Sequence, residues 1–228
     1  MDEGTFQVGA YSIPEAARLI DANAAQIRRW VSGYRYRHDD ALHLQPPLWR
    51  PQHEEGDSGP LLGFRDLIEA RIVRALRKQN IGLQSISICL KRAQEIVDDE
   101  RPFSSARFKT DGKSIFLEIT EGLEEPRLID LKKRQHVFRR IVKPSFKDLE
   151  FDEEAAVRWW PVAGKQTVVI DPTRAFGQPI VASRGISTER LKEAVDAEGS
   201  IDQVARLYDL TPQIIRDALD YQETLRAA

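Results

Sequence analysis

The sequence predicts a mainly helical α+β protein in three parts. We expect an N-terminal winged helix-turn-helix domain over residues 1–103, a small antiparallel β element with a basic linker over 104–165, and a three-helix, helix-turn-helix-like bundle over 166–228. Two observations lead to this prediction. Apolar residues recur at helical spacing near both ends of the chain, and shorter runs between them alternate as in strands. Charge varies along the chain as well, because residues 101–147 are net basic and residues 148–228 are net acidic.

The stretch YSIPEAARLIDANAAQIRRW, residues 11–30, holds the signals of two short helices joined by a turn. Ser12 is a suitable N-cap for the first helix, and Asn23 is a suitable N-cap for the second. The apolar residues of the second helix share one face: Ile27, Trp30 and Val31. Two short amphipathic helices joined by so tight a turn form a helix-turn-helix.

The open face of the second helix presents long hydrogen-bond donors, which suit phosphates and base edges. We expect the alternating residues 34–37 to form a strand, and residues 38–60, rich in Pro, Gly, His and Asp, to form a long flexible loop. This order of elements predicts a winged helix-turn-helix that binds DNA. The alternative is a solvated face on an ordinary helical hairpin. The candidate DNA-binding residues are Ser12, Asn23, Gln26, Arg28, Arg29, Arg35, Tyr36 and Arg37.

Two longer amphipathic helices are expected at about residues 64–79 and 83–97, separated by a break at Gly82. The stretch YSIPEAARLI…IRRW followed by GFRDLIEARIVRALRKQNIGLQSI resembles the MerR family of DNA-binding proteins over about residues 11–97. In that family a helix-turn-helix and a wing precede a helix that starts near F-x-x-D-L. The resemblance implies a recognition helix with Gln26, Arg28 and Arg29, and a wing with Arg35, Tyr36 and Arg37.

In the middle of the chain, Asp111-Gly112 is a strong signal for a type I′ hairpin turn. We expect a strand at residues 114–119 after this turn and a further short strand at 127–131. The segment LKKRQHVFRRIVKPSFK, residues 131–147, then holds seven basic residues and no acidic residue. Two interpretations stay open for it, contact with a phosphate backbone and a solvated connection.

In the last third, short strands are expected at residues 168–170 and 180–181, with a turn at 176–179 between them. Three short helices with tight turns follow. Their expected N-caps are Ser187 or Thr188 for the first, Ser200 for the second and Thr211 for the third. Acidic residues dominate this unit and would repel a phosphate backbone, so it suits a protein partner better than DNA.

This region is similar to the family called domain of unknown function four-thirty-three. The matching motifs are Asp171-Pro172, the turn Gly177-x-Pro179-Ile180, Glu198-Gly199-Ser200 and Leu210-Thr211-Pro212. Together with the N-terminal half, the chain resembles VapB-type antitoxins. The resemblance implies an antitoxin that pairs with a PIN-like ribonuclease toxin. It assigns no individual toxin-binding residue. Winged helices of this kind usually bind palindromic DNA as two-fold dimers, so we also expect a homodimer on the protein's own promoter.

Several other classes find no support in the sequence. It contains no G-x-S-x-G motif, Gly-rich phosphate loop or metal-ligand spacing, so we expect no enzyme, cofactor or metal site. Apolar runs are too short to cross a membrane, and no signal peptide is evident, which predicts a cytoplasmic protein. The alternative function is a MerR-like regulator that responds to a small ligand. Against a sensor role, Cys89, the single cysteine, falls within an amphipathic helix and is expected in the core.

Overall fold

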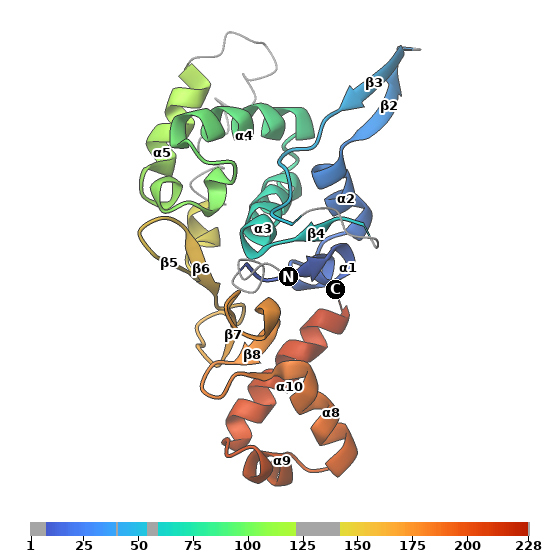
Figure 1. Ribbon diagram of the computed structural model, residues 1–228, viewed down its shortest axis with the longest axis vertical. Helices are drawn as coiled ribbons and strands as arrows, with labels where there is room; N and C mark the ends of the chain where they lie inside the picture. The colour runs from blue at the N-terminus through green and yellow to red at the C-terminus, as the bar shows by residue number, and fades with distance from the viewer. Residues whose placement is uncertain (1–7, 40, 54–58, 122–141, 228) are drawn as a thin grey trace.

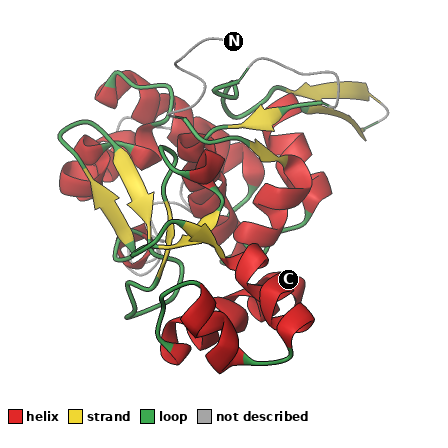
Figure 2. Ribbon diagram, turned by 60° about the horizontal axis from the view of Figure 1, so that its bottom comes forward, coloured by secondary structure: helices red, strands yellow, loops and turns green. Residues whose placement is uncertain are grey.

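The computed structural model describes residues 8–39, 41–53, 59–121 and 142–227. Within these ranges the chain is mainly helical and carries small antiparallel sheets, which confirms the predicted α+β class (Figures 1 and 2). Figure 1 shows a β-hairpin projecting at one end of the molecule and the C-terminal helices at the opposite end.

The predicted helix-turn-helix is present and both of its N-caps are as expected. Strand β1 (Tyr11–Ser12) leads into α1 (Ile13–Leu19), and α2 (Ala24–Ser32) follows the turn. Ser12 and Glu15 form a reciprocal capping box, in which the Ser12 amide donates to Glu15 Oε2 at 2.8 Å. Asn23 Oδ1 accepts hydrogen bonds from the first amides of α2, at 2.9 Å from Ala25 and 3.3 Å from Gln26.

The segment after α2 is a two-stranded wing, so the prediction of a loop throughout residues 38–60 is wrong. Strand β2 (Tyr34–His38) pairs antiparallel with β3 (Ala41–Gln45). Composition misled the prediction, because the short alternating run in β3 is flanked by Pro, Gly, His and Asp. The chain then returns through the buried side chains of Leu48 and Trp49 to β4 (Leu61–Leu62), which pairs with β1.

Helices α3 (Phe64–Lys78) and α4 (Leu83–Val97) lie where the sequence predicted them. A buried carboxylate, Asp66, ties the start of α3 to two distant segments. Its Oδ2 accepts from the Gln52 amide at 2.7 Å, and its Oδ1 accepts from Arg101 Nε at 2.6 Å. Charge-assisted hydrogen bonds of this kind compensate for the burial of both charged groups. The return segment of the wing is therefore fixed to α3.

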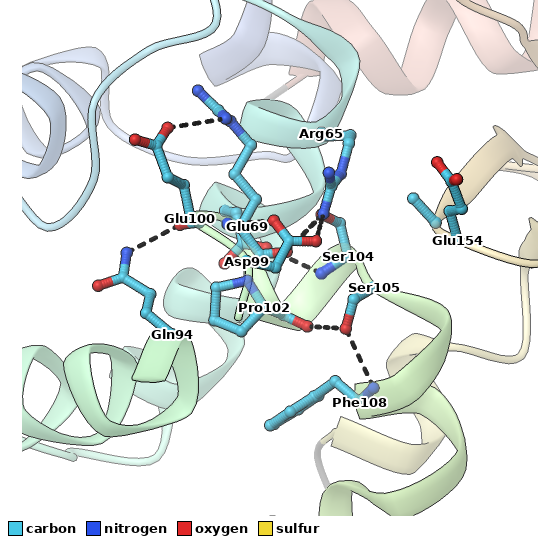
Figure 3. A network of polar contacts seen from close by, with 12 residues as sticks. Arg65, Glu69, Gln94, Asp99, Glu100, Pro102, Ser104, Ser105, Phe108 and Glu154 are labelled. Atoms are coloured by element: carbon cyan, nitrogen blue, oxygen red, sulfur yellow. Dashed lines mark hydrogen bonds and ion pairs between the residues drawn. The ribbon is translucent and has the colours of Figure 1, made fainter. Parts of the chain in front are cut away.

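A second polar cluster joins α3 to the short 3-10 helix η2 (Pro102–Ser104), as Figure 3 shows. Arg65 of α3 donates to Asp99 at 2.6 Å and to the Ser104 hydroxyl at 2.9 Å. Glu69, one helical turn further along α3, is fully buried and accepts from the Ser104 amide at 2.8 Å. These contacts place the segment after α4 against α3.

The predicted hairpin at Asp111-Gly112 is wrong, because these residues lie inside α5 (Ala106–Glu121). The Ser105 hydroxyl caps this helix by accepting from the Phe108 amide at 3.0 Å. Phe108, Gly112 and Ile115 share its buried face. A helical Gly costs about 1 kcal/mol relative to Ala, whereas burial of a large apolar side chain contributes about 1.5–3 kcal/mol. Packing therefore outweighs the local turn signal.

The strand predicted at residues 114–119 is wrong for the same reason, because α5 continues through these residues. The remaining predictions for the middle fall largely outside the described residues. The expected strand at 127–131 lies there entirely, and so does most of the basic segment 131–147. Within the described part of that segment, residues 142–145 are helical and Val142 is buried. The interpretation of the segment as a DNA contact stays a prediction.

A five-stranded antiparallel sheet connects the middle of the chain to its C-terminal part. Its strands follow chain order: β5 (Leu149–Phe151), β6 (Ala156–Trp159), β7 (Val168–Ile170), β8 (Pro179–Val181) and β9 (Ile186–Ser187). The buried Trp159 ring lies 4.8 Å from the guanidinium carbon of Arg71 on α3. This contact attaches the sheet to the N-terminal half.

The C-terminal helices confirm the predicted elements. They are α8 (Thr188–Glu198), α9 (Ile201–Leu207) and α10 (Pro212–Ala227), with Ser187 and Ser200 as the first two N-caps. They enclose a small core of their own, whereas the main core runs from Tyr11 to Ile170. Helix α10 ends beside α1 (Figure 1). The three-part division of the chain at 103/104 and 165/166 stays a prediction.

Candidate nucleic-acid interface

Helix α2 separates its buried and open faces as the sequence indicated. Ile27, Trp30 and Val31 pack into the main core, and Ile27 is completely buried. Gln26, Arg28 and Arg29 are exposed on the other face. The hydrophobic contacts therefore fix the rotation of α2 and direct its long donors outward, in the arrangement that a recognition helix requires.

The wing has two faces of different character. Tyr34 and Tyr36 alternate along β2 with Arg35 and Arg37, so the aromatic rings and the guanidinium groups lie on opposite faces. The aromatic face packs against the domain. Tyr36 stacks on His43 with a centroid separation of 5.4 Å, and the Tyr36 hydroxyl accepts from Gln84 Nε2 of α4 at 3.3 Å.

On the second face, Arg35 pairs across the hairpin with Leu44, and Arg37 pairs with Leu42. Both leucines are strongly exposed, with 65% of Leu42 and 69% of Leu44 accessible to solvent. In the described part of the chain, the side chains of Arg35 and Arg37 make no hydrogen bond or ion pair. The wing thus presents two arginines and two leucines together, a combination that suits DNA backbone and groove walls.

Three of the predicted site residues, Arg29, Ser12 and Asn23, make contacts within the protein. Arg29 joins α2 to the wing, because its guanidinium carbon lies 5.6 Å from the centroid of the Tyr34 ring. Ser12 is partly buried and its hydroxyl donates to Glu15 Oε2 at 2.6 Å, so it serves the capping box. Asn23 is exposed at the start of α2, but its side-chain oxygen is engaged by the helix amides. Their contacts with DNA stay a prediction.

Sequence reasoning missed a basic groove next to α2. The turn of the helix-turn-helix faces the C-terminal half of α3 across an open groove of about 720 Å³. Its cationic lining residues are Arg18, Arg74, Arg77 and Lys78. The helical spacing of Arg74, Arg77 and Lys78 was visible in the sequence, but only the fold shows that they meet the turn.

A second hollow separates α1 from α8 and α10. This cleft has a volume of about 580 Å³ and is lined by Tyr11, Glu15 and Arg18 on one side and by Lys192, Gln222 and Leu225 on the other. It therefore lies between the helix-turn-helix and the C-terminal helices. Its volume is within the range of about 300–1,000 Å³ that is typical of small-molecule sites.

We also searched the described residues for a reactive thiol, a metal site and a membrane-spanning helix. Cys89 is a buried free thiol, and burial raises its pKa to about 12. Among the described residues, no group of three or more His, Cys, Asp or Glu side chains is arranged to hold a metal ion. No described helix is both long enough and apolar enough to span a membrane.

Comparison with known proteins extends this picture. The chain is 29% identical over 227 residues to "Putative antitoxin VapB45" of Mycobacterium tuberculosis, with 94% of each chain covered. It is 24% identical over 231 residues to "Uncharacterized protein Rv2308" of the same organism, covering 96% of this chain and 92% of that protein. The crystal structure of Rv2018 from M. tuberculosis superposes with a TM-score of 0.74 at 26% identity, covering 92% of this chain and 96% of Rv2018.

Two family matches coincide with the two ends of the molecule. Residues 9–90, which include the helix-turn-helix, the wing and α3, match the family described as "Putative DNA-binding HTH domain". Residues 168–222, from β7 into α10, match the family described as "Protein of unknown function (DUF433)". The two matches therefore fall on separate regions of the chain, one on the helix-turn-helix with its wing and the other on the C-terminal strands and helices.

Proposed function

We propose that this protein is a DNA-binding antitoxin that regulates its own promoter and neutralises a PIN-like ribonuclease toxin supplied by a second chain. The observation that carries the proposal is the open face of α2, where Gln26, Arg28 and Arg29 point away from a buried apolar face. Arginines bind phosphates and guanine edges, and glutamine binds adenine edges. The match of residues 9–90 to a DNA-binding family supports the same conclusion.

The wing adds a second contact to this interface. Arg35 and Arg37 share their face with Leu42 and Leu44, and that face is open. In winged proteins a helix usually binds the major groove, and the hairpin contacts the DNA beside it. We further propose a homodimer of MerR-like geometry that binds a palindromic site, since two-fold dimers read two half-sites.

We assign the antitoxin role, binding of the toxin, to the C-terminal part. Similarity to a protein described as an antitoxin supports it, over nearly the whole length of both chains. The exposed acidic side chains of this part also favour a basic protein partner over DNA: Asp196, Glu198, Asp202, Asp209 and Asp220. A ribonuclease needs basic surface to hold RNA, so the two charge patterns are complementary. This function needs a cytoplasmic location and no cofactor.

The test is a mobility-shift measurement of the purified protein on its own upstream DNA, with and without the product of the neighbouring gene. We expect a specific shift that tightens when the neighbour is present. A shift that ignores the neighbour would contradict the antitoxin role. No shift on any DNA would contradict the interface on α2.

A second candidate function is a regulator that responds to a small ligand. The cleft between α1 and the C-terminal helices favours it, because a ligand there would touch both Tyr11 beside the helix-turn-helix and Gln222 of α10. The same mobility shift separates the two functions. A ligand-responsive regulator would bind DNA without regard to the neighbouring protein, and its affinity would change on addition of a small molecule that fills the cleft.

A further inference from the structure

The groove between the helix-turn-helix and α3 can bind an anion in addition to any phosphate bound by the exposed face of α2. It opens beside the first turn of α2, because Asn23, Ala24 and Gln26 line its edge. The amino end of a helix carries partial positive charge. Arg18 of α1 and Arg77 and Lys78 of α3 bring further positive charge to the same hollow. The groove therefore continues the basic surface of α2 onto a third helix.

Two cations in this groove already converge on a single anionic oxygen. Asp21, in the turn between α1 and α2, accepts through Oδ2 from Arg74 and also from Lys78 Nζ, the latter at 3.2 Å. The three residues come from segments more than 50 positions apart in the sequence. Asp21 is the only acidic side chain among the described residues that line the groove.

We propose that this groove binds a phosphodiester group of the DNA backbone and that Asp21 competes with that phosphate for Arg74 and Lys78. The inference rests on the proposed DNA binding and adds α3 to the interface. A carboxylate oxygen and a phosphate oxygen accept from the same donors, and Arg binds both well. Both Asp21 and Lys78 are more than half exposed, so bound DNA reaches them without rearrangement of the core.

Asp21 then sets the strength of backbone binding. In the free protein it offsets part of the charge that Arg74 and Lys78 offer to DNA. Each phosphate that a protein neutralises steepens the dependence of log affinity on log salt concentration by about 0.9. Removing the charge of Asp21 should therefore strengthen binding on every DNA sequence and steepen its salt dependence.

The deciding experiment measures DNA affinity against salt concentration for the full chain and its Asp21→Asn variant, on the protein's own upstream DNA and on a scrambled duplex. Asn is the appropriate substitution because Asp21 has a φ of 50°, a conformation that Asn also tolerates. The matched control is Glu95→Gln on α4. Glu95 also pairs with a cation, Arg92, and its side chain is 65% exposed, against 61% for Asp21.

We expect Asp21→Asn to raise the affinity several-fold on both duplexes and to steepen the slope by about one phosphate equivalent. Lys78→Gln should lower the affinity and shallow the slope by about the same amount, while Glu95→Gln leaves both unchanged. Thermal melting verifies that each variant is folded. If Asp21→Asn is unfolded, Lys78→Gln alone tests the proposal. Equal slopes for wild type, Asp21→Asn and Lys78→Gln would overturn the inference while DNA binding stands. Absence of DNA binding in the wild type would overturn the proposed function and this inference together.

Discussion

The hydroxyl of Tyr11 donates a hydrogen bond to the carbonyl oxygen of Gly177 at 2.9 Å, across 166 positions of sequence. Tyr11 immediately precedes the capping box of α1, and Gly177 ends the 3-10 helix η4 (Ala175–Gly177) between β7 and β8. The Ala10 amide donates to the neighbouring Phe176 carbonyl at 3.0 Å. The start of the helix-turn-helix is therefore fixed directly to the region that matches the DUF433 family.

The first prediction concerns this link. Gly177 has a φ of +82°, and a Cβ added there would overlap the Tyr11 hydroxyl. Tyr11→Phe should lower the free energy of unfolding by about 1–3 kcal/mol, because the buried carbonyl loses its partner. Gly177→Ala should cost more, since it adds backbone strain and displaces the ring. Urea denaturation of both variants checks the order, and a smaller loss for Gly177→Ala than for Tyr11→Phe would contradict it.

The second prediction concerns α2, the proposed recognition helix. Arg28 is exposed on α2 and makes no hydrogen bond or ion pair within the described residues. Arg28→Ala should weaken binding on all DNA sequences about equally and shallow the salt slope by about one phosphate equivalent. Arg216→Ala, which removes an exposed arginine from α10, is the matched control. Unchanged affinity in titrations of Arg28→Ala would remove this residue from the interface.

The third prediction separates the two faces of the wing. Arg37→Gln should lower DNA affinity and shallow the salt slope, because its guanidinium lies on the open face beside Leu42. Tyr36→Phe should change DNA affinity little, because the Tyr36 hydroxyl is engaged by Gln84 of α4. Affinities from fluorescence anisotropy test the difference. Equal losses for the two variants would show that both faces of the hairpin reach DNA.

The sequence predicted those elements whose signals are local and consistent. Ser12 and Asn23 cap the helices that they were expected to cap, because an N-cap depends only on the next few amides. The hairpin at Asp111-Gly112 was wrong because burial of Phe108 depends on distant residues. The groove could not be predicted either, since Asp21 meets Arg74 only after α3 folds back onto the turn. In the sequence, Asp21 and Arg74 are indistinguishable from ordinary charged surface residues.

The fourth prediction concerns Cys89, which lies on the buried face of α4. Burial raises its pKa to about 12, so the reactive thiolate is scarce at neutral pH. The native protein should react with an aromatic disulfide reagent orders of magnitude more slowly than the urea-unfolded chain. The absorbance change on thiol release measures both rates. Fast reaction of the native protein at neutral pH would contradict a core position and reopen the possibility of a cysteine sensor.

The last prediction follows from Glu69, the buried carboxyl of the network in Figure 3. Burial raises its pKa to about 8, and one of its oxygens, Oε2, has no hydrogen-bond partner. The Glu69 carboxyl is therefore neutral in the native state at neutral pH, whereas it is charged in the unfolded chain above its ordinary pKa of 4.5. Folding takes up a proton, so this contribution to stability is complete below pH 4.5 and is lost as the pH rises through about 8.

Between pH 4.5 and about 8, the titration of Glu69 should lower the free energy of unfolding by about 1.4 kcal/mol per pH unit. Glu69→Gln keeps the shape of the side chain and removes the titration, so its stability should depend less on pH. Urea denaturation at pH 5.5, 6.5 and 7.5 measures both slopes at about 25 °C. Glu95→Gln, which changes an exposed carboxylate on α4, serves as the control. A slope as steep in Glu69→Gln as in the wild type would show that another group takes up the proton, because the Gln amide cannot.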